Sequence, residues 1–419
     1  MMRQLYNLLW CLILPFALLR LWWRGQREPG YLQHIAERLG YFKVTPSRPV
    51  IWLHAVSLGE TRAAEPLIRA LQQGYPNHQI LLTHMTATGR AASAELFGDT
   101  VLRCWLPYDL PWFMFHFLQH FKPVLGLIME TEVWPNLMQA AQQQGVSMVL
   151  VNARLSEKSL KQSLRLLTIA QPAYASFTTV LAQTPGDADR LRIIGAPLAT
   201  ITSNLKFDMA LPADKLALGQ QWKTVLSNRR IWLCASTREG EEALILQAWR
   251  HEPRPDDILL LIVPRHPQRF DEVAQLIDSE GLTLTRRSDW DGQASIGSTV
   301  LLGDSLGEMS AYYSLADVAY VGGSLLPLGG QNLIEACAAG CPVLLGPHTF
   351  NFAQASQDAI AAGAARRVVD VWELIQQATQ LLDDTVARQT MAAAGRAFAE
   401  ANRGALVRTL SEIEKLLSE

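Results

Sequence analysis

Hydrophobic residues in the first half of the chain form short continuous runs, separated by stretches in which apolar residues recur every three or four positions. The runs are Val50–Val56, Gln79–Thr83, Val124–Met129, Ser147–Val151 and Thr179–Ala182. Such runs are typical of parallel strands buried on both faces. The stretches between them, such as Thr61–Gln73 and Pro135–Gln144, have the period of helices. This alternation predicts an α/β domain whose parallel sheet is covered on both faces.

The same rhythm resumes after a break at Asp208–Asn228. The second series of runs is Ile231–Ala235, Ile258–Val263, Thr299–Leu302, Val318–Val321 and Pro342–Leu345. The sequence therefore predicts two successive Rossmann-like, doubly wound domains at residues 28–208 and 229–419, joined by a linker at 209–228. Two such domains facing each other form a cleft, where we expect the active site.

The N-terminus is apolar and carries no charge from Gln4 to Leu19. This run is shorter than the roughly 20 residues of a spanning helix, and Pro15 interrupts it. Interface-forming residues follow: Arg20, Trp22, Trp23, Arg24 and Arg27. Because tryptophans beside arginines are typical of a bilayer interface, residues 1–27 are predicted to be a membrane anchor or in-plane helix with a cytoplasmic body. The alternative is a core helix of the first domain.

Composition excludes several classes of protein. The 419 residues include 18% charged residues and have a net charge of −2, without the basic blocks typical of nucleic-acid binding. The five cysteines contain no CxxC pair, which favours a reducing compartment over a disulfide framework or a structural zinc site. Asp289-Trp290-Asp291 has the form of a DxD metal motif, but it lies in a polar stretch with glycine and is predicted to be a surface loop.

Glu60 is the first candidate for chemistry. It ends the segment VIWLHAVSLGE, in which an apolar run leads into a helical pattern. Ligands collect at the carboxyl ends of parallel strands, and the helix dipole favours a carboxylate at a first turn. We therefore expect Glu60 to be ionised and able to accept a proton. The alternative is an ordinary acidic residue at a helix start.

Glu130 and Glu132 follow another strand-like run, in LIMETEVWPN. Since alternate residues of an extended segment face opposite ways, at most one of them should face the cleft. The other is expected to cap the helix that begins near Pro135. Lys206, in NLKFD, could bind a phosphate, or it could be an ordinary surface lysine.

In the second half, Arg265 and His266 end a strand-like run, where the arginine fork suits a phosphate or carboxylate. The pairs Gly322-Gly323 and Gly329-Gly330 allow close approach of an anion to the backbone. A helix is expected from about Gln331, with Asn332 and Glu335 on one face. Glu335 could then accept hydrogen bonds from both ribose hydroxyls of a nucleotide. The alternatives are a surface pair and structural glycines.

With these motifs assembled, the chain resembles the 3-deoxy-D-manno-oct-2-ulosonic acid (Kdo) transferases of lipopolysaccharide biosynthesis over nearly its whole length. The shared motifs include VSLGE, METEVWPN, NARLS, NLKFD, STREGEE, VPRHPQRF, GDSLGEM, VGGSL and GPHTFNF. The resemblance implies a GT-B glycosyltransferase that moves Kdo from CMP-Kdo to the lipid A precursor, lipid IVA, with inversion and without a metal ion. It also implies the cytoplasmic side of the inner membrane, and no nucleic-acid partner.

The resemblance also implies roles for individual residues. Glu60 matches the general base, and Glu130 and Lys206 match residues that stabilise the transition state. The CMP-binding segments correspond to Arg265, His266, Leu306, Gly307, Glu308, Asn332, Leu333, Ile334 and Glu335. Gln331 departs from the pattern, because many relatives have histidine there, and a glutamine cannot become cationic. Leu333 also stands where proline is frequent. The alternative functions are another GT-B glycosyltransferase, a sugar-nucleotide epimerase, or a non-catalytic membrane-bound scaffold.

Overall fold

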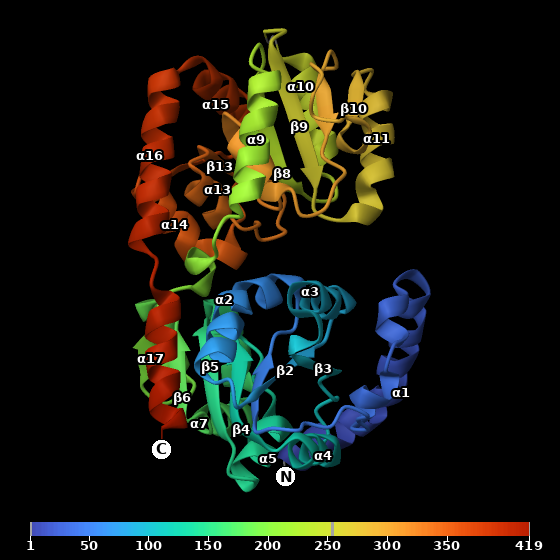
Figure 1. Ribbon diagram of the computed structural model, residues 1–419, viewed down its shortest axis with the longest axis vertical. Helices are drawn as coiled ribbons and strands as arrows, with labels where there is room; N and C mark the ends of the chain where they lie inside the picture. The colour runs from blue at the N-terminus through green and yellow to red at the C-terminus, as the bar shows by residue number, and fades with distance from the viewer. Residues whose placement is uncertain (1, 253–254, 419) are drawn as a thin grey trace. The chain divides into compact units, whose positions relative to one another are not determined.

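The computed structural model describes residues 2–252 and 255–418, which divide into two compact units (Figure 1). Unit 1 comprises residues 1–209 together with 403–419, and unit 2 comprises residues 210–402. Each unit contains one seven-stranded sheet in which all neighbouring strands are parallel. The prediction of two successive α/β units with parallel sheets is confirmed.

The sheet of unit 1 has the strand order β3-β2-β1-β4-β5-β6-β7. Its strands are β1 (Val50–His54), β2 (Gln79–His84), β3 (Leu102–Trp105), β4 (Pro123–Met129), β5 (Ser147–Ala153), β6 (Thr179–Ala182) and β7 (Ala199–Ile201). Its helices are α2 (Leu58–Gly74), α3 (Ala87–Phe97), α4 (Pro111–Phe121), α5 (Pro135–Gln143), α6 (Glu157–Arg165), α7 (Leu167–Ala175) and α8 (Pro185–Ile193). Alternate side chains of β1 enter different cores, with Trp52 in one and Leu53 in the other. Both faces of the sheet are therefore buried.

The sheet of unit 2 has the order β10-β11-β9-β8-β12-β13-β14. Its strands are β8 (Arg230–Thr237), β9 (Ile258–Pro264), β10 (Leu284–Arg286), β11 (Val300–Leu302), β12 (Val318–Val321), β13 (Val343–Leu345) and β14 (Ala365–Arg367). Its helices are α9 (Ala213–Val225), α10 (Glu241–His251), α11 (Phe270–Ser279), α12 (Met309–Leu315), α13 (Ile334–Ala339), α14 (Ala353–Ala361), α15 (Val371–Asp383) and α16 (Thr385–Ala401).

Four strands were not predicted, and all four are edge strands. They are β3 and β7 in unit 1, and β10 and β14 in unit 2. Each has only three or four residues, and none of the four is buried throughout. An edge strand needs no continuous apolar run, because one of its sides has no neighbouring strand. The hydrophobic pattern therefore detects the central strands and misses the edges.

The boundaries of the units differ from the predicted domains at two places. The expected linker at 209–228 contains α9, whose Trp222 is buried and whose Gln220 amide donates to the Ser314 carbonyl oxygen at 2.9 Å. Residues 403–419 belong to unit 1, because α17 (Ala405–Leu417) buries Ile413 in the core beside α2. The Asp208 carboxylate also accepts the Gly404 N–H at 2.6 Å.

The N-terminal helix α1 (Met2–Arg27) lies on the surface of unit 1 (Figure 1). Tyr6, Asn7 and Trp10 face the body of the unit, where the Tyr6 hydroxyl donates to Asp109 at 2.8 Å and Trp10 packs against Tyr108. Only 6% of the 18-residue apolar stretch of α1 is buried. The alternative of a core helix is therefore wrong, because α1 turns most of its apolar surface outward.

Candidate active site

Glu60 is fixed at the start of α2 by a reciprocal pair of contacts. Ser57 is the N-cap of α2, and its hydroxyl accepts the Glu60 N–H at 3.4 Å and donates to the Glu60 carboxylate at 3.0 Å. The Val56 N–H donates to the other carboxylate oxygen at 2.8 Å. This arrangement resembles a capping box, except that the backbone N–H bonded to the carboxylate belongs to Val56, one residue before the N-cap. The contacts hold the side chain against the loop that follows β1. The predicted place of Glu60, at a strand end and in a first turn, is confirmed.

The protonation of Glu60 differs from the prediction. Burial and the nearby Glu130 charge raise the pKa of Glu60 to about 7, although the Val56 N–H and the Ser57 hydroxyl act in the opposite direction. The side chain therefore holds a proton more readily than an ordinary glutamate, whereas the helix dipole alone suggested an ionised carboxylate. A carboxyl group with a pKa near the working pH is well suited to accept a proton in a reaction.

Glu130 lies at the end of β4, which neighbours β1 in the sheet. Its carboxylate is buried and accepts hydrogen bonds from Lys206 Nζ at 2.7 Å and Arg154 Nε at 2.8 Å. Burial alone would raise the pKa of Glu130, but the two cations outweigh it and hold the pKa below its ordinary value. The structure therefore brings the predicted residues Glu60, Glu130 and Lys206 together and adds Arg154.

Lys206 is positioned by asparagines on two sides. Asn204 Oδ1 accepts the Lys206 N–H, and Asn152 Oδ1 accepts the Leu205 N–H, both at 3.0 Å. Asn152 and Glu130 have φ angles of 54° and 57°, in the left-handed region that is unusual outside glycine. Backbone strain of this kind is often found at functional sites. Sequence reasoning assigned no role to Arg154 or Asn152, although both belong to the NARLS motif that follows a strand run.

Glu132 does not cap α5, contrary to the prediction. It accepts the indole N–H of Trp134 at 2.9 Å instead. The first turn of α5 is capped by Asp109, whose carboxylate accepts the N–H groups of Asn136 at 3.1 Å and Leu137 at 2.9 Å. Asp109 precedes α4, and its place beside α5 depends on tertiary structure that the local sequence pattern does not contain.

In unit 2, cationic side chains gather at the carboxyl ends of β8 and β9. Arg265 Nε donates to Gln331 Oε1 at 3.3 Å. Burial, and then the charges of Arg238 and Arg265, lower the pKa of His266, which favours its neutral form. Gln331 thus provides an uncharged acceptor to Arg265.

The other predicted nucleotide contacts of unit 2 fall into two groups. Glu308 accepts from Arg287 at 3.0 Å, in a loop where Gly307 has a φ of 75° and the Leu306 side chain is 76% exposed. Glu335 accepts from the Ser310 hydroxyl at 2.7 Å. Ser310 lies in the first turn of α12, directly after the loop of Leu306, Gly307 and Glu308. Its hydroxyl therefore connects this loop to Glu335.

The segment before α13 departs from the predicted helix. The helix begins at Ile334 rather than near Gln331, so Asn332 precedes it and its Oδ1 accepts the Ile334 N–H at 3.1 Å. Asn332 and Glu335 therefore do not share a helix face. The side chains of Leu333 and Ile334 are buried in the interior, which leaves only their backbone for contact with a ligand.

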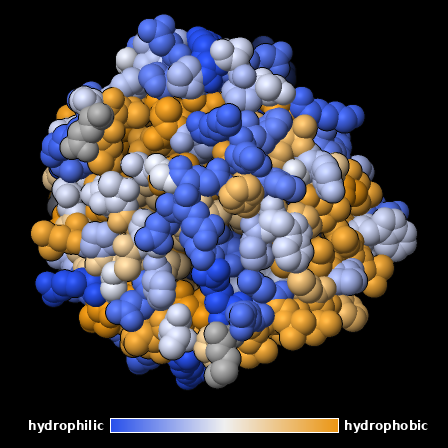
Figure 2. All heavy atoms as spheres, turned by 90° about the horizontal axis from the view of Figure 1, so that it is seen from below, coloured by the Kyte–Doolittle hydropathy of each residue, from blue (hydrophilic) through white to orange (hydrophobic). Residues whose placement is uncertain are grey.

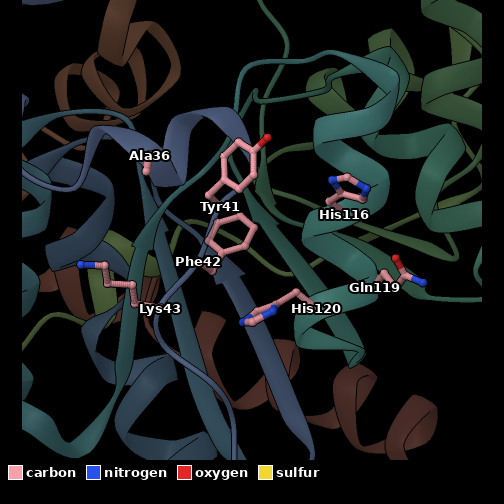
Figure 3. A pocket seen from close by; sticks show the side chains of 8 residues that line it. Ala36, Tyr41, Phe42, Lys43, His116, Gln119 and His120 are labelled. Atoms are coloured by element: carbon pink, nitrogen blue, oxygen red, sulfur yellow. The ribbon is translucent and has the colours of Figure 1, made fainter.

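Neither the DxD sequence nor a surface hollow of unit 1 contains a predicted site residue. Asp289 and Asp291 are exposed while Trp290 between them is buried, which confirms the predicted surface loop. A hollow of about 510 Å³ lies between residues 40–43 and α4 of unit 1 (Figure 3). Phe42 packs there against Phe117, and none of the predicted site residues lines the hollow.

Comparisons with known proteins give a consistent result. The model of the family described as 3-deoxy-D-manno-octulosonic-acid transferase (kdotransferase) matches residues 33–209. The 3-deoxy-D-manno-octulosonic acid transferase of Bordetella pertussis is 48% identical, with 99% of both chains covered. The enzyme of the same name from Haemophilus influenzae is 35% identical, with 100% of this chain and 99% of that protein covered.

Among solved structures, the UDP-GlcNAc 2-epimerase of Neisseria meningitidis bound to UDP-GlcNAc has a TM-score of 0.60. It is 16% identical, and the match covers 88% of this chain and all of that one. A putative UDP-N-acetylglucosamine 2-epimerase from Listeria monocytogenes also has a TM-score of 0.60, at 15% identity over 89% of this chain. At such low identity these likenesses show the fold alone, and they confirm the predicted two-domain GT-B type.

The raised pKa of Glu60 predicts a pH-dependent loss of stability that Glu60→Gln removes. Folding raises this pKa from about 4.5 to about 7, so the folded state binds the proton more tightly. Stabilisation from this group is complete below pH 4.5 and is lost as the pH rises through 7, by up to roughly 3 kcal/mol. Denaturant titrations at pH 5 to 8 should show the wild type losing this stability relative to Glu60→Gln. Parallel pH profiles of the two proteins would contradict the raised pKa.

Proposed function

The chain belongs to the 3-deoxy-D-manno-octulosonic acid transferase family and is a glycosyltransferase, and from this premise we propose its substrates and mechanism. We propose that it transfers Kdo from CMP-Kdo to lipid IVA, the lipid A precursor, with inversion and without a metal ion. The 48% identity over the whole length to a curated Kdo transferase supports this activity over an epimerase, another glycosyltransferase or a scaffold.

The observation that carries the proposal is the carboxyl group of Glu60, with its pKa of about 7, beside the cluster of Glu130, Lys206 and Arg154. Glu60 accepts the proton of an acceptor hydroxyl, and the hydroxyl oxygen forms a bond to the anomeric carbon of Kdo. The bond from that carbon to the phosphate oxygen breaks at the same time, and CMP leaves with the electron pair. A single displacement of this kind inverts the anomeric carbon and needs one general base.

The ion pairs of Glu130 change the role that is proposed for it. Its carboxylate contacts both Lys206 and Arg154, so the three groups together carry one net positive charge. A preorganised cationic cluster suits the negative charge that develops on the leaving phosphate. We therefore propose that Lys206 stabilises this charge, and that Glu130 holds Lys206 in place rather than offsetting positive charge at the sugar ring.

The donor nucleotide is proposed to bind to unit 2. Arg265 provides the charge and the planar fork that a phosphate needs, and His266 adjoins it. Glu335, whose orientation the Ser310 hydroxyl fixes, would accept from the ribose hydroxyls. Asn332 and Glu308 complete the set of polar side chains. Leu306 and Gly307, like Leu333 and Ile334, are proposed to contribute through the backbone.

Glu60→Gln tests the assignment of the general base. The amide keeps the shape of the side chain but cannot accept the proton, so we expect transfer to fall by about 10² to 10⁴. The measurement is turnover of CMP-Kdo on lipid IVA by purified protein, with mass spectrometry of the product. Glu65→Gln is a matched control, because Glu65 lies on the same helix and pairs with Arg69. Turnover of Glu60→Gln close to that of the control would overturn the assignment.

We propose that α1 holds the enzyme at the cytoplasmic face of the inner membrane, where a lipid acceptor lies. The large apolar side chains of its outward face are exposed: Met2, Leu5, Leu8, Leu9, Leu12, Ile13, Phe16, Leu19, Trp22 and Trp23. Figure 2, which views the molecule from below, shows wide apolar areas divided by a band of hydrophilic side chains. Because the inward stripe of α1 packs against unit 1, an in-plane position is favoured over a spanning one.

Polar substitutions on this outward face should release the protein from membranes without unfolding it. Leu12, Phe16 and Leu19 are 61%, 72% and 62% exposed, so changing all three to glutamine removes lipid contacts and few internal ones. We expect loss of co-sedimentation with anionic vesicles, an unchanged unfolding temperature, and normal activity on detergent-dispersed acceptor. The control changes three exposed apolar residues outside α1 to glutamine: Val124, Ile193 and Leu198. Equal sedimentation of the two triple variants would place the membrane contact elsewhere.

A further inference from the structure

Glu241, in the STREGEE motif, is a fully buried carboxylate with four hydrogen-bond donors. One of its oxygens accepts from the Tyr320 hydroxyl at 2.6 Å and the Leu325 N–H at 3.0 Å. The other accepts from the Gly323 N–H at 2.6 Å and the Arg238 N–H at 2.9 Å. All four donors are uncharged groups. Placing a carboxylate in the interior without a cation is costly, and only such a complete set of donors offsets that cost.

Three of these donors come from two loops that Glu241 joins, and the fourth, Tyr320, belongs to β12. Arg238 lies between β8 and α10, while the segment Gly322–Leu325 follows β12. Because β8 and β12 are neighbours in the parallel sheet, both loops leave the same carboxyl edge. Ligands of α/β proteins bind at this edge. The carboxylate therefore acts as a clamp between two loops at the edge where the donor nucleotide is proposed to bind.

The turn held by this clamp has a conformation that leaves no room for a larger residue. A Cβ atom on Gly322 would lie 2.5 Å from the Ser236 carbonyl oxygen, and Gly323 has a φ of 71°. This turn is bonded to the second glycine pair, because the Gly323 carbonyl accepts the Gly330 N–H at 2.7 Å. Gly330 precedes Gln331, which accepts from Arg265. One continuous series of contacts thus connects Glu241 to the arginine proposed to bind phosphate.

We propose that Glu241 is a positioning residue for the donor and does not touch the donor itself. Its carboxylate fixes the glycine turn, and the turn holds Gly330 and Gln331 in the arrangement that binds the CMP phosphate. This inference rests on the proposed function. Loss of the clamp weakens CMP and CMP-Kdo binding while leaving the acceptor and the base Glu60 unaffected. A purely structural role would lower stability and leave affinity for CMP unchanged.

Glu242 provides a matched control for this role. It is as fully buried as Glu241 and is the next residue of α10. Its carboxylate accepts from Thr237 at 2.8 Å and Arg269 at 2.7 Å, and neither partner belongs to the glycine turn. Glu242→Gln therefore disturbs a buried carboxylate of the same helix without removing a hydrogen bond to the turn.

The experiment measures CMP binding by calorimetry and thermal unfolding for the full-length wild type, Glu241→Gln and Glu242→Gln. A glutamine can accept with only one of its two terminal atoms, so about half of the clamp is lost. We expect the dissociation constant of CMP to rise about 10- to 100-fold in Glu241→Gln, as for one or two lost hydrogen bonds, and to stay within about twofold in Glu242→Gln. In transfer assays, KM for CMP-Kdo should rise while KM for lipid IVA stays constant.

Wild-type CMP affinity in Glu241→Gln, or equal weakening in the two variants, would overturn the inference. Tyr320→Phe, which removes one of the four donors, should raise the CMP dissociation constant about threefold, so the inference stays testable if Glu241→Gln does not fold. An unchanged dissociation constant in Tyr320→Phe would also overturn it. A wild type that fails to bind CMP would overturn the proposed donor and this inference with it. That result is distinct from one in which the wild type binds CMP and Glu241→Gln binds it equally well, which overturns only the inference.

Discussion

The buried charge of Glu130 is the interaction on which the arrangement of the site in unit 1 depends. Its carboxylate contacts the cations of Lys206 and Arg154, which keeps Glu130 ionised in a place where burial alone would favour its neutral form. The same negative charge raises the pKa of Glu60. One carboxylate thus holds the residue proposed to stabilise the leaving group and adjusts the proton affinity of the proposed base. Removing it would alter both functions at once.

Both units use a buried carboxylate at the carboxyl edge of the sheet, but they satisfy it differently. Two cations surround Glu130, so the cluster keeps a net positive charge that attracts anions. Three backbone N–H groups and a phenol donate hydrogen bonds to Glu241, so its carboxylate is satisfied by uncharged donors. Arg265 and Arg238 lie at the same edge, where Arg238 pairs with Glu239 at 3.0 Å, and their positive charge is of the kind that a phosphate requires.

The sequence was sufficient for the central features and insufficient for those that depend on distant partners. Apolar runs located β1 and β4 because both are buried on two faces, and the strand ends then located Glu60 and Glu130. The pKa of Glu60 could not be predicted, since it depends on burial and on a charge that lies 70 positions along the chain. The cap of α5 was misassigned because Asp109 approaches from another loop. Residues 403–419 were assigned to the second domain because the sequence does not identify the core in which Ile413 is buried.

The pH dependence of kcat/KM for Kdo transfer tests the central claim most directly, because it reports the ionisation of groups in the free enzyme. If Glu60 is the base and its pKa is about 7, activity should fall below pH 7 with the slope of a single proton. In Glu130→Gln this limb should move to lower pH, since burial still raises the pKa but the neighbouring negative charge is gone. A limb near the ordinary pKa of about 4.5, or one that Glu130→Gln leaves in place, would contradict the account.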